Sequence, residues 1–315
     1  MEMIEFKHVT KSYNGNDALN DVSVKINKGD FVFLVGPSGA GKSTFIKLIL
    51  KEIDPDEGSI IVKGEEVTRM SNRKIPRHRR NIGIVFQDFR LLPQKTVYEN
   101  VAFAMEITHQ SKRAIKRNVP QALALMGISE YASKYPSELS AGEQQRVAIA
   151  RAIVNKPTVL IADEPTGNLD PVTAWEIMKL LEEINARGTT IVMVTHAKDI
   201  VDRMQKRVIV IERGRIVRDE FGKYGLGGTR ASAIEPDPYM EDDFNEAVAD
   251  EYEGLSKKRE KRKKGEVFGR RTTEMPKKAL EKEFSDASAE EADSIDEASV
   301  EDAFAKAERL LTRHE

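Results

Sequence analysis

The 315-residue chain contains no cysteine, which excludes disulfides and cysteine metal sites and suits a reducing compartment. No apolar run approaches the roughly 18 to 20 residues that a membrane span requires, and the start lacks the basic and apolar regions of a signal peptide. The formal net charge of -2 gives no global field that would attract nucleic acid. We therefore expect a cytosolic chain without a nucleic-acid partner, folded as one large domain or two modest ones.

A glycine-rich segment lies between a run of five apolar residues, Phe31 to Val35, and an amphipathic run, Thr44 to Ile53. The segment consists of Gly36, Pro37, Ser38, Gly39, Ala40, Gly41, Lys42 and Ser43, and Thr44 follows it directly. Its spacing, G-x-x-x-x-G-K-[ST], lets backbone N–H groups and a helix dipole converge on a polyphosphate. Lys42 is expected along the β- and γ-phosphates, and Ser43 is expected to bind Mg²⁺. The alternative is a glycine-rich turn between two core elements, but the strand before and the helix after favour a phosphate loop.

Two adjacent acids follow a second buried strand, predicted from Val159 to Ala162. Open α/β sheets place their ligands at the carboxyl ends of the strands, where Asp163 and Glu164 emerge. Asp163 is placed to hold Mg²⁺ through water, and Glu164 to orient or deprotonate the attacking water. Alone, these residues would be two solvated acids; together with a phosphate loop they predict a hydrolytic site.

A third motif, LSAGEQQR, begins at Leu139 and opens a helix that runs to Ile153. Ser140 and free backbone N–H groups at the helix start make a second anion site. One phosphate chain cannot be wrapped by both sites of one subunit if they lie in separate subdomains. This geometry predicts a homodimer in which the serine helix of each subunit closes on the nucleotide of the other.

Short apolar runs recur as far as residue 224 and predict an α/β fold. The later runs alternate with helical patterns, which predicts a largely parallel sheet, while the early runs lie close together and predict a small antiparallel sheet that includes Ser59 to Val62. A helix-rich insertion is expected at about 88–155. Its helices are predicted at Val97 to Ile107, Ala114 to Met126 and Ser140 to Val154.

Residues 225–315 form a charged tail with few large apolar residues, for which we expect disorder. Acidic blocks at 235–253 and 281–302 flank a basic run at 257–264. A short helix is predicted at 297–312, where apolar residues fall at helical spacing. The alternatives to a solvated tail are folding back through opposite charges and contact with anionic lipid.

The phosphate loop, Gln87, LSAGEQQR, VLIADE, Asn168-Leu169-Asp170 and His196 occur in the order that is typical of ABC transporter ATP-binding subunits. Residues 1–224 resemble that family, which implies a P-loop NTPase fold with an antiparallel β subdomain and a helical subdomain, using ATP and Mg²⁺. The family usually has two glycines after the signature serine, and here the first is Ala141. We expect this departure to affect closure or turnover more than the site itself.

The resemblance also assigns roles to individual residues. Tyr13 would stack on adenine, or else be a surface aromatic. Gln87 would contact Mg²⁺ and the attacking water, or else be a solvated strand end. His196 would hold the γ-phosphate, or else cap a helix. The residues implied to act across the dimer are Ser140 and Gly142, which would contact the partner's γ-phosphate, and Asp170.

Four stretches, Val85 to Pro93, GEQQRVAIARA, DEPTGNLDP and Ile200 to Met204, resemble the cell-division branch of the family, the FtsE ATP-binding proteins, in particular actinobacterial forms. The resemblance implies a peripheral protein on the cytoplasmic side of the cell membrane, at the division septum. There it would dimerise on ATP beneath a membrane partner resembling FtsX and control peptidoglycan hydrolases. Two alternatives stay open: the ATPase of a lipoprotein-release or macrolide/peptide-export transporter, and a nucleotide-gated scaffold with incidental turnover.

The segment after Gln87 is the expected output element of such a motor. Its apolar residues Phe89, Leu91 and Leu92 are predicted to form an exposed socket for a partner helix, or else to belong to the core of the insertion. Outside the motifs, we expect Trp175 to pack. The remaining histidines, expected to be solvated, are His8, His78, His109 and His314.

Overall fold

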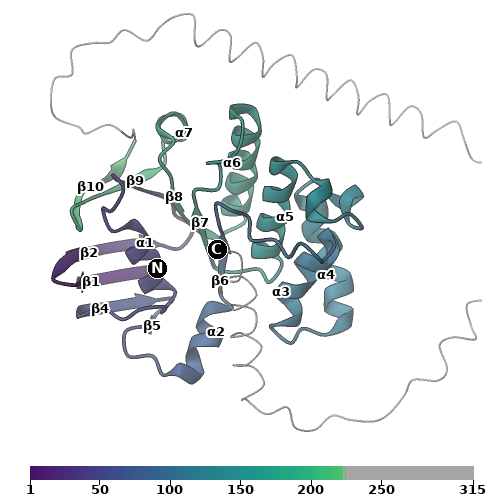
Figure 1. Cartoon of the computed structure of the whole chain (residues 1–315). Coiled ribbons are helices and arrows are strands. Elements are labelled where there is room, and N and C mark those ends of the chain that lie inside the picture. Colours follow the sequence, from purple (N-terminus) through teal and green to yellow (C-terminus); the bar gives the residue numbers. More distant parts are fainter. Residues whose placement is uncertain (223, 225–315) are drawn as a thin grey trace, which may run out of the picture. The chain divides into compact units, whose positions relative to one another are not determined.

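The computed structural model describes residues 1–222 and Tyr224, which form two sheets with their helices (Figure 1). The first sheet is antiparallel and has the strand order β2-β1-β4-β5. Its strands are β1 Glu2–Tyr13, β2 Asn16–Asn27, β4 Glu57–Val62 and β5 Glu65–Glu66. Buried and exposed residues alternate along the second half of β2, as expected for a sheet with one face toward the core. The predicted antiparallel sheet is confirmed.

The second sheet has the order β10-β9-β3-β8-β7-β6, and every neighbouring pair is parallel except β10 with β9. Its strands are β3 Phe31–Val35, β6 Ile82–Val85, β7 Val159–Asp163, β8 Thr190–Val194, β9 Arg207–Glu212 and β10 Arg215–Phe221. Strand β3 is continuously apolar because both of its faces are covered. Phe33 and Val35 join one core cluster, whereas Val32 and Leu34 join the other.

Seven α-helices lie in the described part of the chain: α1 Lys42–Ile49, α2 Ile75–Arg79, α3 Val97–Glu106, α4 Lys112–Leu125, α5 Ala141–Ile153, α6 Pro171–Ala186 and α7 Lys198–Met204. Short 3₁₀ helices, η1 Asn72–Lys74, η2 Ser129–Tyr131 and η3 Pro136–Glu138, complete the described elements. Helices α3 to α5 lie, to within two residues, where the three helices of the insertion are predicted. Helix α1 is shorter than predicted, because the chain leaves it at Lys51, which has a left-handed φ of 55°.

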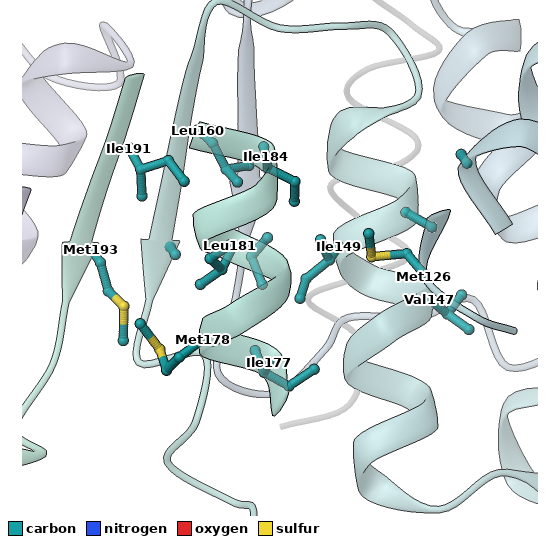
Figure 2. Close-up of a cluster of buried hydrophobic side chains, with 14 of the residues drawn as sticks. Met126, Val147, Ile149, Leu160, Ile177, Met178, Leu181, Ile184, Ile191 and Met193 are labelled. Atoms are coloured by element: carbon teal, nitrogen blue, oxygen red, sulfur yellow. The ribbon is translucent and has the colours of Figure 1, made fainter. Parts of the chain in front are cut away.

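One face of the parallel sheet is covered in two layers of helix. Figure 2 shows side chains of α6, such as Leu181 and Ile184, lying between Leu160 and Ile191 of the sheet and Ile149 of α5. The other face buries α1 and the antiparallel sheet in a second cluster, in which the rings of Phe6 and Phe45 stack with centroids 4.2 Å apart. The parallel sheet is thus fixed on both faces, which holds the carboxyl ends of its strands as a rigid platform.

Two predictions about single side chains have different outcomes. Trp175 packs against the helical cluster, with the guanidinium of Arg203 at 4.0 Å from its ring, so the packing role is confirmed. The expectation of a solvated His78 is wrong: it is buried, and its Nε2 donates to the carbonyl of Ile49 at 2.7 Å. Burial lowers the pKa of His78, so the ring is neutral at neutral pH.

His8 and His109 are exposed, as expected, whereas His314, the predicted helix at 297–312 and the predicted disorder of 225–315 lie outside the described residues. Within the described part, none of the helices has the length and apolar character needed to cross a bilayer.

Candidate nucleotide site

The loop between β3 and α1 depends on three glycines with positive φ: Gly36 at 149°, Gly39 at 76° and Gly41 at 112°. Space also requires two of them. A Cβ on Gly36 would lie 2.1 Å from the carbonyl oxygen of Ile211, and one on Gly41 would lie 2.2 Å from that of Ala18. Because α1 has Gly41 as its N-cap residue and no side-chain cap, its first N–H groups remain available to a ligand. The loop therefore fits a phosphate cradle.

Lys42 places its ammonium inside this loop. Its Nζ donates to the carbonyls of Gly36 at 2.8 Å and Pro37 at 2.9 Å, and the residue is buried. Burial lowers the pKa of Lys42, while the charges of Glu164 and Asp163 act in the opposite direction. The ammonium is thus held by the loop close to the two acids at the end of β7.

Asp163 ends strand β7 and lies beside Val194 of β8. Burial, followed by the neighbouring charge of Glu164, raises the pKa of Asp163. A divalent cation bound there would stabilise the ionised Asp163 carboxylate and so offset this rise in pKa. No cluster of three or more acidic, His or Cys side chains in the described part forms a metal cage, so Mg²⁺ would need phosphate oxygens as further ligands. Asp163 and the exposed Ser43 hydroxyl fit such a shared site.

Glu164 stands just beyond the strand with a left-handed φ of 47°, and its N–H donates to the carbonyl of Val194 at 2.9 Å. Its Oε1 lies 3.2 Å from Nε2 of His196, which follows β8. Helix α7 has Ala197 as its N-cap residue and no side-chain cap, so His196 is not a helix cap. The carboxylate and the imidazole are instead paired in the partly exposed space beside Lys42.

Gln87 follows β6 and lies over the loop after Glu164. Its carbonyl accepts a hydrogen bond from Asn168 Nδ2 at 3.2 Å. A Cβ on Gly167 would come within 3.2 Å of the Gln87 amide nitrogen, so this glycine makes room for the side chain. The structure therefore places Gln87 against the same loop that carries Glu164.

Tyr13 ends β1 at the tight turn to β2 and is 43% exposed. Its ring has Lys11 Nζ at 5.7 Å. Ala18, just after the turn, touches the loop at Gly41, so the hairpin lies against the phosphate loop. An exposed ring in this position is open to stacking.

Ser140, Gly142 and Asp170 meet at a second place, a cavity of about 260 Å³. Among the described residues, its lining includes none of the phosphate loop. Ser140 caps α5, and Asp170 caps α6 by accepting from the N–H groups of Val172 at 3.1 Å and Thr173 at 3.0 Å. The hydrogen bonds from Thr173 lower the pKa of Asp170.

The close approach of α5 and α6 explains the signature. A Cβ on Gly142 would lie 2.4 Å from the Thr173 methyl carbon, whereas Ala141 is exposed and has no left-handed φ. Alanine is therefore compatible with the first signature position, whereas a side chain at the second would press on Thr173.

Sequence reasoning missed the roles of four side chains that line this cavity, Glu143, Arg146, Thr173 and Glu176. Glu143 completes a capping box with Ser140, and the S-x-x-E spacing could have revealed it. Arg146 forms an ion pair with Glu176 of α6, and no local pattern indicated that contact between helices.

The output segment, residues 88–96, differs from its prediction. Phe89, Leu91 and Leu92 are partly buried instead of exposed, and Leu91 packs against the helical cluster. Part of the expected socket thus belongs to the core of the helical subdomain.

Comparisons with known proteins agree with this geometry. The sequence profile of the ABC transporter family matches residues 19–167. The "Cell division ATP-binding protein FtsE" of Bacillus subtilis (strain 168) is 58% identical over 225 residues, which are 71% of this chain and 99% of the relative. The FtsE of Mycobacterium tuberculosis (strain ATCC 25618 / H37Rv) is 56% identical over 227 residues, with the same coverage. The FtsE of Escherichia coli (strain K12) is 46% identical over 215 residues, covering 68% and 97%.

Among solved structures, the dimeric post-hydrolysis state of the ATP-binding cassette MJ0796 bound to ADP and Pi superposes with a TM-score of 0.63. It is 34% identical, and the match covers 71% of this chain and all of the cassette. The structure of cbiO1 from Clostridium perfringens, part of an ABC transporter complex, gives 0.66 at 34% identity, covering 70% of this chain and 88% of that one.

Proposed function

Since the chain belongs to the ABC transporter family of ATPases, in the group of cell division ATP-binding proteins FtsE, we propose that ATP closes two copies of it into a dimer that drives a membrane partner at the division septum. The chain is an ATP-binding and ATP-hydrolysing subunit that uses Mg²⁺. The observation that carries the proposal is the meeting of Lys42, Glu164 and His196 at the carboxyl ends of the adjacent strands β3, β7 and β8.

Hydrolysis needs an activated water on the far side of the γ-phosphate from ADP. The Glu164 carboxylate accepts a proton from this water, whose oxygen bonds to phosphorus as the bond to the β–γ bridging oxygen breaks. His196, whose Nε2 lies 3.2 Å from Glu164 Oε1, keeps the carboxylate oriented and would contact the γ-phosphate. Mg²⁺ held by Ser43, Gln87 and Asp163 would neutralise phosphate charge. The Lys42 ammonium and the backbone N–H groups of the loop from Gly36 to Thr44, in which every residue except Pro37 has one, hold the phosphates. Tyr13 stacks on adenine.

The second half of each ATP site comes from the partner copy. Ser140, Gly142 and Asp170 share one cavity that excludes their own subunit's phosphate loop, which supports a role across the dimer. The N–H groups at the start of α5 then act on the partner's γ-phosphate. Closure thereby depends on ATP, because each subunit alone offers half of the site.

Closure of the dimer must be transmitted to a protein in the membrane. We assign the output segment as the contact for an integral membrane partner resembling FtsX, which would pass closure outward to septal peptidoglycan hydrolases. The relatives that carry the FtsE name support this choice over an export transporter. Co-purification of the chain with a four-span membrane protein from its own cells tests it. Recovery of a transporter-length membrane domain instead would contradict the division role.

Glu164→Gln separates hydrolysis from binding. The amide cannot accept the proton, so the variant is expected to bind ATP and to form a stable dimer, with turnover at least a hundredfold lower. Size-exclusion chromatography and phosphate release measure the two properties. Loss of division in cells that carry only this variant supports a motor. If division proceeds normally, the chain is a nucleotide-gated scaffold and the motor proposal is wrong.

A further inference from the structure

Arg151, near the end of α5, binds backbone carbonyls of the output segment with its side chain. Its guanidinium donates to the carbonyl of Phe89 at 2.8 Å and to that of Arg90. Removal from water, and then the charge of Arg90, lowers the pKa of Arg151 to about 10, while Asp88 acts in the opposite direction. The side chain therefore stays charged at neutral pH, and both hydrogen bonds are charge-assisted.

The backbone that Arg151 holds is unusual. Phe89 and Arg90 are consecutive non-glycine residues with left-handed φ values of 58° and 47°. Such residues cost energy and persist where surrounding contacts fix them. The side chain of Arg90 contributes locally: it stacks on Phe86 at 4.1 Å and pairs with Asp88 at 3.2 Å. Arg151 supplies the contact from another element.

Asn100 of α3 holds the far end of the same segment. It is fully buried, and its Oδ1 accepts from the N–H of Leu92 at 2.7 Å. Its Nδ2 donates to the carbonyls of Leu92, Lys95 and Thr96 at 3.1, 2.9 and 3.0 Å. The output segment is thus fastened to the helical subdomain from Phe89 onward.

Gln87, two residues before Phe89, is fastened to the other side. Asn168 donates to its carbonyl, and its amide lies over Gly167 in the loop that carries Glu164. Asp88 alone lies between Gln87, which contacts the loop after Glu164, and Phe89, whose carbonyl is held by Arg151 of α5. A displacement of α5 relative to the sheet must therefore be taken up at Asp88 or passed on to Gln87.

Helix α5 also carries Ser140 at its start, eleven positions before Arg151, which is about 16 Å along a helix. A helix of this length moves as one body. On the proposed dimer, Ser140 meets the partner's nucleotide, so its displacement reaches Arg151 at the other end.

We propose that Arg151 is a positioning residue that couples α5 to Gln87, so that engagement of Ser140 by the partner's nucleotide sets the place of Gln87 in the subunit's own site. The inference rests on the proposed dimer. It makes the two ATP sites communicate through a helix, a guanidinium and two backbone carbonyls, and it gives the strained turn at Phe89 and Arg90 a role.

A double-mutant cycle on turnover tests the coupling. Arg151→Met keeps a long side chain and removes every donor, so kcat of the full-length ATPase is expected to fall roughly tenfold while KM for ATP changes less than about twofold. If Arg151 acts through Gln87, the same substitution in the Gln87→Ala variant has no further effect. Arg151→Lys, which keeps the charge and the donors but lacks the planar fork of the guanidinium, should recover part of the rate. Multiplication of the two single effects in the double variant would overturn the proposal.

Controls separate this outcome from misfolding and from failure of the dimer. Arg113→Met on the exposed side of α4 should leave kcat unchanged. If Arg151→Met does not fold, the cycle is run with Arg151→Lys under the same criterion. In the Glu164→Gln background, Arg151→Met should still form the ATP dimer. Absence of a dimer with Glu164→Gln alone defeats the proposed function, whereas an intact dimer with multiplicative kcat effects defeats only the coupling.

Discussion

Helix α1 has Gly41 as its N-cap residue and no side-chain cap, whereas helix α5 has Ser140 as its N-cap residue, within a complete capping box. At α5, the Glu143 carboxylate accepts from both the N–H and the hydroxyl of Ser140 at 2.8 Å. A carboxylate and a phosphate oxygen use the same donors. The N–H groups of the phosphate loop are therefore available to a ligand within one subunit. At the start of α5, in contrast, the donors of Ser140 are already occupied by the Glu143 carboxylate. The difference suits a first site that binds ATP alone and a second that responds only when a partner presents phosphate.

The largest effect is expected at the phosphate loop. Lys42→Ala removes the ammonium held within the loop, and ATP affinity should fall at least a hundredfold, about 2.7 kcal/mol. Isothermal titration of the full chain measures it, with Lys47→Ala on the exposed side of the same helix as the matched control. Unchanged affinity in the Lys42 variant would rule out the phosphate-loop assignment.

A smaller effect is expected where α5 meets α6. In Gly142→Ala the new methyl would press on Thr173, 2.4 Å away, so we expect a loss of about 1 to 3 kcal/mol in the free energy of unfolding. Urea denaturation checks this. Thr173→Ser removes the obstructing methyl but keeps the hydroxyl, and should restore most of the loss in the double variant. Equal destabilisation by Gly142→Ala with either residue at 173 would contradict the packing argument.

Removing the Ser140 cap should impair the dimer without impairing ATP binding at the phosphate loop. Ser140→Ala is expected to cost about 1 kcal/mol in unfolding free energy and to prevent the ATP dimer in the Glu164→Gln background. ATP binding to the monomer should remain, because the loop is complete without it. Titration and size-exclusion chromatography report the two properties. A dimer of normal stability would show that Ser140 has no role across the interface.

The smallest effect concerns pH. Burial works to raise the pKa of Glu143, but hydrogen bonds from Ser140 and Tyr131 outweigh it, and the net pKa is lowered from 4.5. The resulting stabilisation is present above pH 4.5 and is lost as pH falls through the folded-state pKa. Glu143→Gln keeps the capping geometry but has no charge to lose, so it should be less stable than the wild type near pH 7 by a few tenths of a kcal/mol. This difference should shrink as pH falls below 4.5, because only the wild type loses stability there. If the free energies of unfolding of the two proteins change in parallel with pH down to pH 3, the Glu143 carboxylate makes no such contribution.

Much of the fold could be predicted because its signals are local. Continuous apolar runs such as Phe31 to Val35 predict strands that are buried on both faces, and the ends of α3 to α5 fell within a few residues of their predicted positions. The burial of His78 could not be predicted, because its partner is the carbonyl of Ile49, which lies 29 positions earlier in the chain. The partial burial of Leu91 likewise depends on how the insertion closes on itself.

By itself, the sequence determined which chemistry this protein carries, since a phosphate loop, a strand ending in Asp163 and Glu164, and a histidine after the next strand are set by neighbouring residues in the chain. Only the tertiary structure decided how those groups are held. The order β3-β8-β7 brings Lys42, Glu164 and His196 together, Thr173 crowds any side chain at 142, and Arg151 reaches Phe89 across 62 positions. These contacts join residues far apart in sequence, and close packing, which no local pattern encodes, determines their geometry.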